Sequence, residues 1–156
     1  MITDAYILDT GPLGLITNPR ESDDGRRCKA WMRSALEAGA RVIVLDVVDY
    51  EVRRELLRAG KVKDLARLDA LTEEIDRLPV DRWAWERAAE LWAESRRRGK
   101  PTAKDNSLDA DLLIAAVAQL VAEDGLSVVV VSDNVGHLGR FVDARDWRDL
   151  ATGEGL

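Results

Sequence analysis

A short apolar stretch that ends in a carboxylate constrains this chain more than any other feature. Residues 5–8 have the character of a buried strand, and Asp9 follows them directly. Gly11 and Pro12 then make a turn, and residues 13–18 read as a short helix. A short apolar run closed by turn residues is typical of a strand in a buried parallel sheet. Ligands bind just beyond the carboxyl ends of such strands, so we expect Asp9 to face a cleft.

The rest of the chain alternates between helical and extended patterns. Further strands are expected at residues 41–45, 78–80 and 127–131, and a last short one after residue 141. Helical spacing of apolar residues covers 28–38, 47–59, 62–77, 82–98 and 108–122, with polar loops at 20–26 and 99–107. Strands that alternate with helices predict an α/β fold with a mainly parallel sheet.

Length and composition narrow the classes of protein. The 156 residues favour one domain at 1–150 and a short tail at 151–156. The single cysteine and single histidine exclude an internal disulfide and a Cys/His zinc site. The sequence has neither a membrane-spanning apolar run nor a signal-peptide pattern, so a cytoplasmic location is expected. The net charge of −6 argues against broad nucleic-acid binding through a basic surface, although a bound cation can supply positive charge.

Carboxylates occur where the predicted elements meet one edge of the sheet. Asp9 and Asp133 each follow a strand, Glu51 lies in the first turns of the helix after the second strand, and Asp111 lies in about the first turn of the most apolar helix. Clustered carboxylates repel one another, and a hard cation such as Mg²⁺ or Mn²⁺ relieves that repulsion. Such a metal activates water and stabilises charge on a phosphate. The sequence also lacks a phosphate-binding glycine loop and a catalytic cysteine, so it favours metal-dependent phosphodiester hydrolysis.

Four motifs, taken in order, resemble those of the PIN domain family, and most closely its VapC-type toxin ribonucleases. They are Ile7-Leu8-Asp9-Thr10-Gly11-Pro12-Leu13, Glu51-Val52-Arg53-Arg54-Glu55-Leu56, Asp111-Leu112-Leu113-Ile114-Ala115-Ala116 and Val130-Val131-Ser132-Asp133-Asn134. The resemblance implies a three-layer α/β/α domain and a Mg²⁺- or Mn²⁺-dependent endoribonuclease. It implies that Asp9, Glu51, Asp111 and Asp133 bind the metal and perform catalysis, with Thr10 in support. It also implies an RNA substrate, a small antitoxin partner and a homodimer.

Two positions in these motifs leave alternatives open. Relatives often read Thr-x-Asp or Thr-x-Asn in the last motif, so the fourth site residue is Asp133 or Asn134. Asp109 competes with Asp111, but residues two apart on a helix face nearly opposite ways. Asp111 is preferred because it directly precedes the apolar run, and Asp105 is a more distant candidate.

Two rival functions are also compatible with the sequence. One is a non-catalytic interaction module with the PIN fold, and the other is a DNA-directed metal-dependent nuclease. A separate expectation concerns Trp85, Ala88, Ala89 and Trp92, whose spacing predicts one apolar stripe on a helix. We expect the two tryptophans to lie in the core or at an interface rather than to stack on bases.

Overall fold

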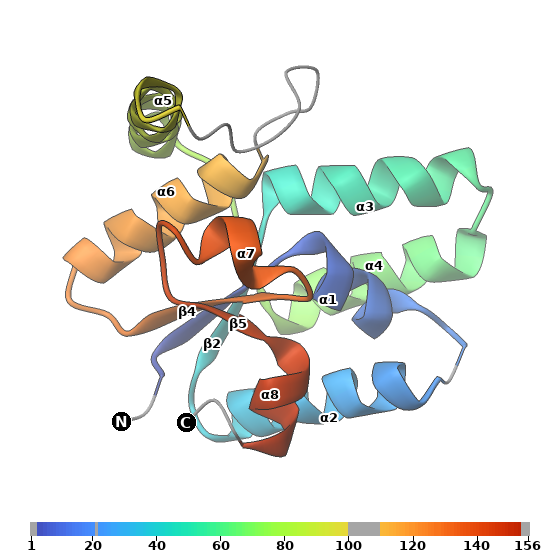
Figure 1. Cartoon of the computed structure of the whole chain (residues 1–156). Coiled ribbons are helices and arrows are strands. Elements are labelled where there is room, and N and C mark those ends of the chain that lie inside the picture. The colour runs from blue at the N-terminus through green and yellow to red at the C-terminus, as the bar shows by residue number, and fades with distance from the viewer. Residues whose placement is uncertain (1–2, 21, 100–109, 154–156) are drawn as a thin grey trace.

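Five parallel strands form the central sheet of the computed structural model, which describes residues 3–20, 22–99 and 110–153 (Figure 1). The strand order is β3-β2-β1-β4-β5. The strands are β1 (Ala5–Leu8), β2 (Arg41–Leu45), β3 (Asp76–Leu78), β4 (Val128–Ser132) and β5 (Ala144–Asp146). The prediction of an α/β fold with a mainly parallel sheet is confirmed, and β5 is the strand expected after residue 141.

Helices cover both faces of this sheet. They are α1 (Thr10–Thr17), α2 (Asp23–Glu37), α3 (Asp46–Arg58), α4 (Val62–Glu74), α5 (Arg82–Arg97), α6 (Ala110–Glu123), α7 (Val135–Leu138) and α8 (Trp147–Thr152). In Figure 1, α5 and α6 lie above the strands and α2 and α8 lie below them. This is the predicted three-layer α/β/α arrangement. None of the helices in the described parts of the chain is long and apolar enough to cross a membrane.

The strand order creates a topological switch point between β1 and β4. The chain proceeds outward from β1 to β2 and β3, and then returns to β4 on the other side of β1. Right-handed crossovers therefore leave β1 and β4 towards opposite faces of the sheet. A crevice opens at the carboxyl ends of two such strands, and it is the usual ligand site of an open α/β sheet.

The core is formed by the central strands and by α6. Ile7, Leu8 and Val131 are fully buried, as expected for strands that are covered on both faces. Helix α6 is buried along its whole first half, where Ala115 and Ala116 have no exposed surface. Small side chains let the helix lie close to the sheet, so the start of α6 is held near the end of β4.

Two helices begin earlier than the sequence pattern predicted. Helix α1 starts at Thr10 because the Asp9 carboxylate caps it and Pro12 falls in the first turn, where no backbone N–H is needed. Helix α2 starts at Asp23 because the Ser22 hydroxyl accepts a hydrogen bond from the Gly25 amide at 3.0 Å. Helix α8 was not predicted.

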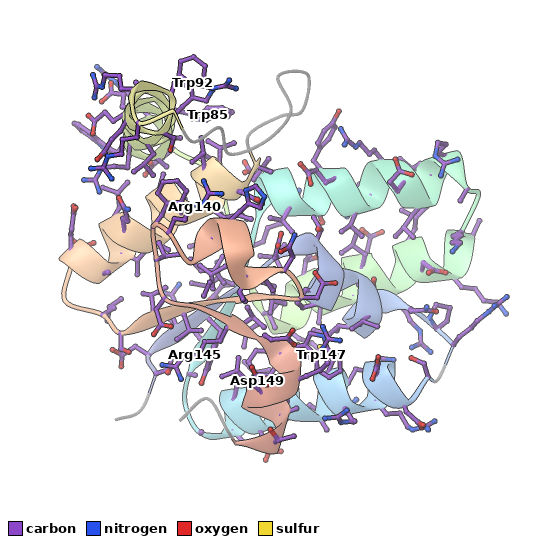
Figure 2. The ribbon with its side chains drawn as sticks, viewed as in Figure 1. Trp85, Trp92, Arg140, Arg145, Trp147 and Asp149 are labelled. Carbon is purple, nitrogen blue, oxygen red and sulfur yellow. The ribbon has the colours of Figure 1, made fainter. Side chains whose placement is uncertain are left out.

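The tryptophan stripe of α5 does not lie in the core. The helix packs on α6 through the small residues Ala84 and Ala88 together with Leu91. Trp85 and Trp92 project from α5 with 51% and 43% of their surface exposed (Figure 2). The buried residues of α5 lie one position away from the two tryptophans along the helix. The prediction that the tryptophans lie in the core is therefore wrong, while the prediction that they lie at an interface is untested.

A buried ion pair ties α3 to the edge of the sheet. Asp49 is 1% exposed, and its carboxylate accepts hydrogen bonds from Arg53 Nε at 2.9 Å and from Arg77 Nη2 at 3.5 Å. Arg53 also reaches the exposed Asp69 of α4 at 2.8 Å. The hydrogen bond to Asp49 is the main cause that raises the pKa of Arg53 above its ordinary range.

We expect Asp49→Asn to lower the free energy of unfolding by about 2–3 kcal/mol, because the buried side chain loses the negative charge that strengthens its hydrogen bonds from the partly exposed Arg53 and Arg77. Asp69→Asn is the matched control, since its exposed carboxylate pairs with the same arginine, and its effect should stay below about 1 kcal/mol. Urea unfolding of both variants measures this difference. Equal losses would contradict a special role for the buried carboxylate.

Candidate functional site

Asp9 stands at the switch point with both carboxylate oxygens engaged. Its backbone amide donates to the Val131 carbonyl at 2.9 Å, so β1 and β4 remain paired up to this residue. Oδ1 accepts from the Thr10 amide at 2.8 Å, and Oδ2 accepts from the Ser132 hydroxyl at 2.8 Å. These bonds fix the orientation of the carboxylate at the place where the sequence predicted a cleft-facing acid.

Ser132 is a site residue that the sequence analysis did not identify. It is fully buried, and its Oγ both donates to Asp9 and accepts from the Asn134 amide at 3.0 Å. One hydroxyl therefore sets the position of Asp9 and the turn that follows β4. The available signal was the place of this serine in the last motif, where relatives often carry threonine.

Glu51 and Asp111 approach Asp9 from two other elements. Glu51 lies in α3, is partly buried, and has a raised pKa. Burial is the largest cause; the nearby Arg54 opposes the shift, and the charges of Asp9 and Asp111 add to it. Asp111 lies in the first turn of α6. Three of the predicted carboxylates are thus close enough to act on one another electrostatically.

Asp133 lies at the same edge but turns towards α1. It is exposed, and its carboxylate sits so close to Gly11 that a methyl group added there would overlap it. Gly11, Asn18, Asp133 and Arg148 line a pocket of 440 Å³, called the edge pocket below. Asp133 is not among the charges that raise the pKa of Glu51.

The remaining predicted positions are only partly described by the structure. Asn134 is exposed and precedes α7, and Thr10 contributes its backbone amide to Asp9. Whether Asp133 or Asn134 is the fourth site residue stays a prediction, as does the role of the Thr10 side chain. Asp105 and Asp109 lie outside the described residues.

The donor set fits a hard divalent cation in kind. Asp9, Glu51 and Asp111 offer only oxygen ligands, and their mutual repulsion is visible in the raised pKa of Glu51. Within residues 3–20, 22–99 and 110–153, however, no three acidic, histidine or cysteine side chains are arranged so that they could hold a metal ion. The charges are therefore gathered at one edge without converging on a single point.

Asp9, Glu51, Asp111 and Asp133 lie at the edge of the sheet where the switch point falls, called the acidic edge below. Such an edge on a β3-β2-β1-β4-β5 sheet defines a class of α/β proteins. The sequence comparison assigns the chain to one family of this class. Residues 6–135 match the PIN domain family. The chain therefore belongs to that family, as the sequence motifs predicted. A comparison with curated protein sequences gave no match.

Solved structures with the same fold share little sequence with the chain. VapBC2 from Rickettsia felis, bound to a DNA fragment from its promoter, superposes with a TM-score of 0.68 and 18% identity, covering 92% of this chain and 98% of that one. VapBC-1 from nontypeable Haemophilus influenzae gives 0.67 and 16%, with the same coverage. DNA-bound VapBC from Salmonella typhimurium gives 0.64 and 19%, covering 94% and 99%. At these identities the likeness establishes the fold.

We expect Gly11→Ala to destabilise the protein by about 1 kcal/mol, because the new methyl group displaces the Asp133 carboxylate. Gly14→Ala in the same helix is the control; it meets no atom within 4 Å and should stabilise by about 0.5–1 kcal/mol. In an Asp133→Ala background, Gly11→Ala should no longer destabilise. Thermal unfolding of these variants tests the contact, and an unchanged penalty in that background would contradict it.

Glu51→Gln should stabilise the protein at neutral pH. At a pH below the ordinary pKa of 4.5, Glu51 is protonated in both the folded and the unfolded chain. Its burial then has no energetic cost from charge. As the pH rises, the folded state holds a repelled, partly buried charge and loses stability relative to the glutamine variant. Urea unfolding in EDTA at about pH 4 and about pH 7 measures this.

Glu55→Gln provides the control for this pH dependence, because Glu55 lies one turn further along α3 and is exposed. The stability of the Glu55→Gln variant relative to the wild type should not rise with pH. A Glu51→Gln variant with the same flat profile would contradict the electrostatic crowding of the site.

Proposed function

We propose that the chain is a metal-dependent endoribonuclease, acting as the VapC-type toxin of a type II toxin–antitoxin pair. The observation that carries the proposal is the position of Glu51, whose raised pKa comes from burial beside Asp9 and Asp111 at the switch point. Carboxylates held together repel one another, and a cation that acts on phosphate relieves that repulsion. Membership of the PIN domain family supports the same chemistry.

Asp9, Glu51 and Asp111 would hold the cation, with Asp133 or Asn134 as the fourth site residue. Mg²⁺ or Mn²⁺ suits this oxygen-only donor set. Once bound, such an ion supplies an activated water and stabilises charge on the phosphate that is being cleaved. Arg54, the one positive charge near Glu51 among the causes of its shift, limits the repulsion within the set.

The chain's own residues perform the positioning. Ser132 and the Thr10 amide hold the two oxygens of Asp9 in a fixed orientation, so little rearrangement is needed when substrate arrives. Glu51, placed by α3 beside Asp9 and Asp111, would bind the cation or position the attacking water.

We further propose a small antitoxin as the partner protein. Three of the structural neighbours are VapBC complexes, two of them bound to DNA, and this supports a partner that links the pair to its own promoter. The homodimer implied by the family resemblance also stays a proposal. The exposed tryptophans of α5, Trp83, Trp85 and Trp92, offer one apolar surface for the dimer contact. The cytoplasmic location remains a prediction.

Cleavage of a mixed RNA pool by purified protein tests the proposal. We expect cuts with Mn²⁺ or Mg²⁺ that disappear with EDTA and in Asp9→Asn, while circular dichroism shows that the variant stays folded. Asp149→Asn, an exposed carboxylate on α8, is the control and should cleave as the wild type does (Figure 2).

The rival functions give different results in the same assay. Cleavage of single- or double-stranded DNA but not of RNA would indicate a DNA-directed nuclease. No cleavage of either nucleic acid, together with no calorimetric binding of Mn²⁺, would indicate a non-catalytic interaction module.

A further inference from the structure

A cleft between α2 and α4 gathers positive charge on a protein whose net charge is −6. Arg26, Lys29, Arg33 and Arg67 line it together with Ala30, and its volume is 480 Å³. We call it the basic cleft. Nothing in the proposed catalytic chemistry uses these residues, which lie on helices rather than at the acidic edge.

The sequence of α2 places its three cations on one side of the helix. Arg26, Lys29 and Arg33 stand at positions i, i+3 and i+7, which share a helical face. Arg67 faces them from α4. Lys29 Nζ donates to the Asn18 carbonyl at 3.3 Å, and Arg67 Nη1 approaches the same oxygen at 3.5 Å. This shared acceptor holds two of the cations at the mouth of the cleft.

The charge of the cleft is only partly neutralised by the protein. Arg26 pairs with the exposed Asp23 of its own helix. Among the ion pairs between described residues, none involves Lys29, Arg33 or Arg67. Cations that remain close together despite their repulsion favour an anionic ligand.

The lining distinguishes a phosphate ligand from a protein segment. Protein interfaces bury a core of aromatic and other apolar side chains. Among the described residues of this lining Ala30 is the only apolar one, and the others are cations with several donors each. Phosphate oxygens along a nucleic-acid strand match such a row of donors without any apolar anchor.

The basic cleft continues from the acidic edge. Asn18 lines the edge pocket next to Gly11 and Asp133, and its carbonyl oxygen also accepts the bonds from Lys29 and Arg67. Helix α1 separates Gly11 in the edge pocket from Asn18 beside the basic cleft. With eight residues, the helix is about 12 Å long. A strand that enters the edge pocket at Gly11 thus reaches the basic cleft after a few nucleotides.

The geometry points to the basic cleft as a binding track for the phosphate backbone of the single-stranded RNA, on one side of the cleavage point. This inference rests on the proposed ribonuclease function, which it deepens by adding a binding surface outside the acidic edge. Binding there is independent of base sequence, because phosphate contacts position a strand without reading it. The basic cleft adds four cations to this path, beside Arg148 of the edge pocket.

Fluorescence anisotropy with a labelled single-stranded RNA of about 20 nucleotides tests the track, at low ionic strength and with EDTA present so that no cleavage occurs. We expect the double variant Arg33→Gln/Arg67→Gln to bind about tenfold more weakly than the wild type. The plot of log affinity against log salt should become less steep by about 1.4, the value for two lost phosphate contacts on a single strand. Arg33→Lys/Arg67→Lys should restore most of the binding.

Arg41→Gln/Arg82→Gln is the matched control, because it removes the same charge from two exposed arginines outside the basic cleft. It should bind within about twofold of the wild type. The inference is overturned if the two glutamine double variants bind alike, if the lysine variant binds as weakly as its glutamine counterpart, or if the wild type does not bind the RNA. If Arg33→Gln/Arg67→Gln binds RNA as tightly as the wild type does, the basic cleft would instead suit an acidic protein partner.

The binding and cleavage assays fail separately. If the wild type cleaves no RNA with Mn²⁺ but the cleft variant still loses RNA affinity, the ribonuclease function is wrong and the track holds. If the wild type cleaves and the cleft variant binds normally, the function holds and the track is wrong.

Discussion

Repulsion between carboxylates at the carboxyl end of β1 is the constraint on which the rest of this structure depends. Asp9, Glu51 and Asp111 come from three different elements; burial is the largest cause that raises the pKa of Glu51, and the charges of Asp9 and Asp111 add to it. Two features hold the arrangement in place: the hydrogen bond from Ser132 to Asp9 across β1 and β4, and the small residues that bring α6 close to the sheet. Each of these features stabilises an edge that carries carboxylates, which pack less easily than apolar side chains do.

Charge is separated on this molecule rather than spread evenly. The acidic edge repels a polyanion unless a cation is bound there, whereas the basic cleft attracts one without help. The edge pocket joins the two through Asn18. On the proposed function, a chain with a net charge of −6 would bind its RNA through the basic cleft, while the carboxylates that would hold the cation stay clustered.

Elements with a strong local pattern could be predicted from the sequence, and elements that depend on partners could not. The strand at Ala5–Leu8 and the position of Asp9 at its end followed from apolar residues next to turn residues. The start of α1 was missed because the capping role of Asp9 outweighs the turn character of Gly11 and Pro12. The exposure of Trp85 followed from tertiary packing, since the face of α5 that packs on α6 carries Ala84, Ala88 and Leu91.

The site shows the same division. The places of Asp9, Glu51, Asp111 and Asp133 next to strands and helix starts could be predicted, but their side-chain directions could not, and their role as a site stays a proposal. Asp133 turns towards Gly11, and the buried hydroxyl of Ser132 holds Asp9, because of contacts between residues more than 120 positions apart. The basic cleft was also missed, since Arg67 joins the cations of α2 only when α4 packs nearby.

The central claim is that Asp9, Glu51 and Asp111 share a divalent cation, and calorimetric titration of Mn²⁺ into wild type and Asp111→Asn tests it most directly. The account predicts saturable binding by the wild type that weakens at least tenfold in the variant, with both proteins folded. Equal binding by the two proteins, or none by the wild type, would contradict it.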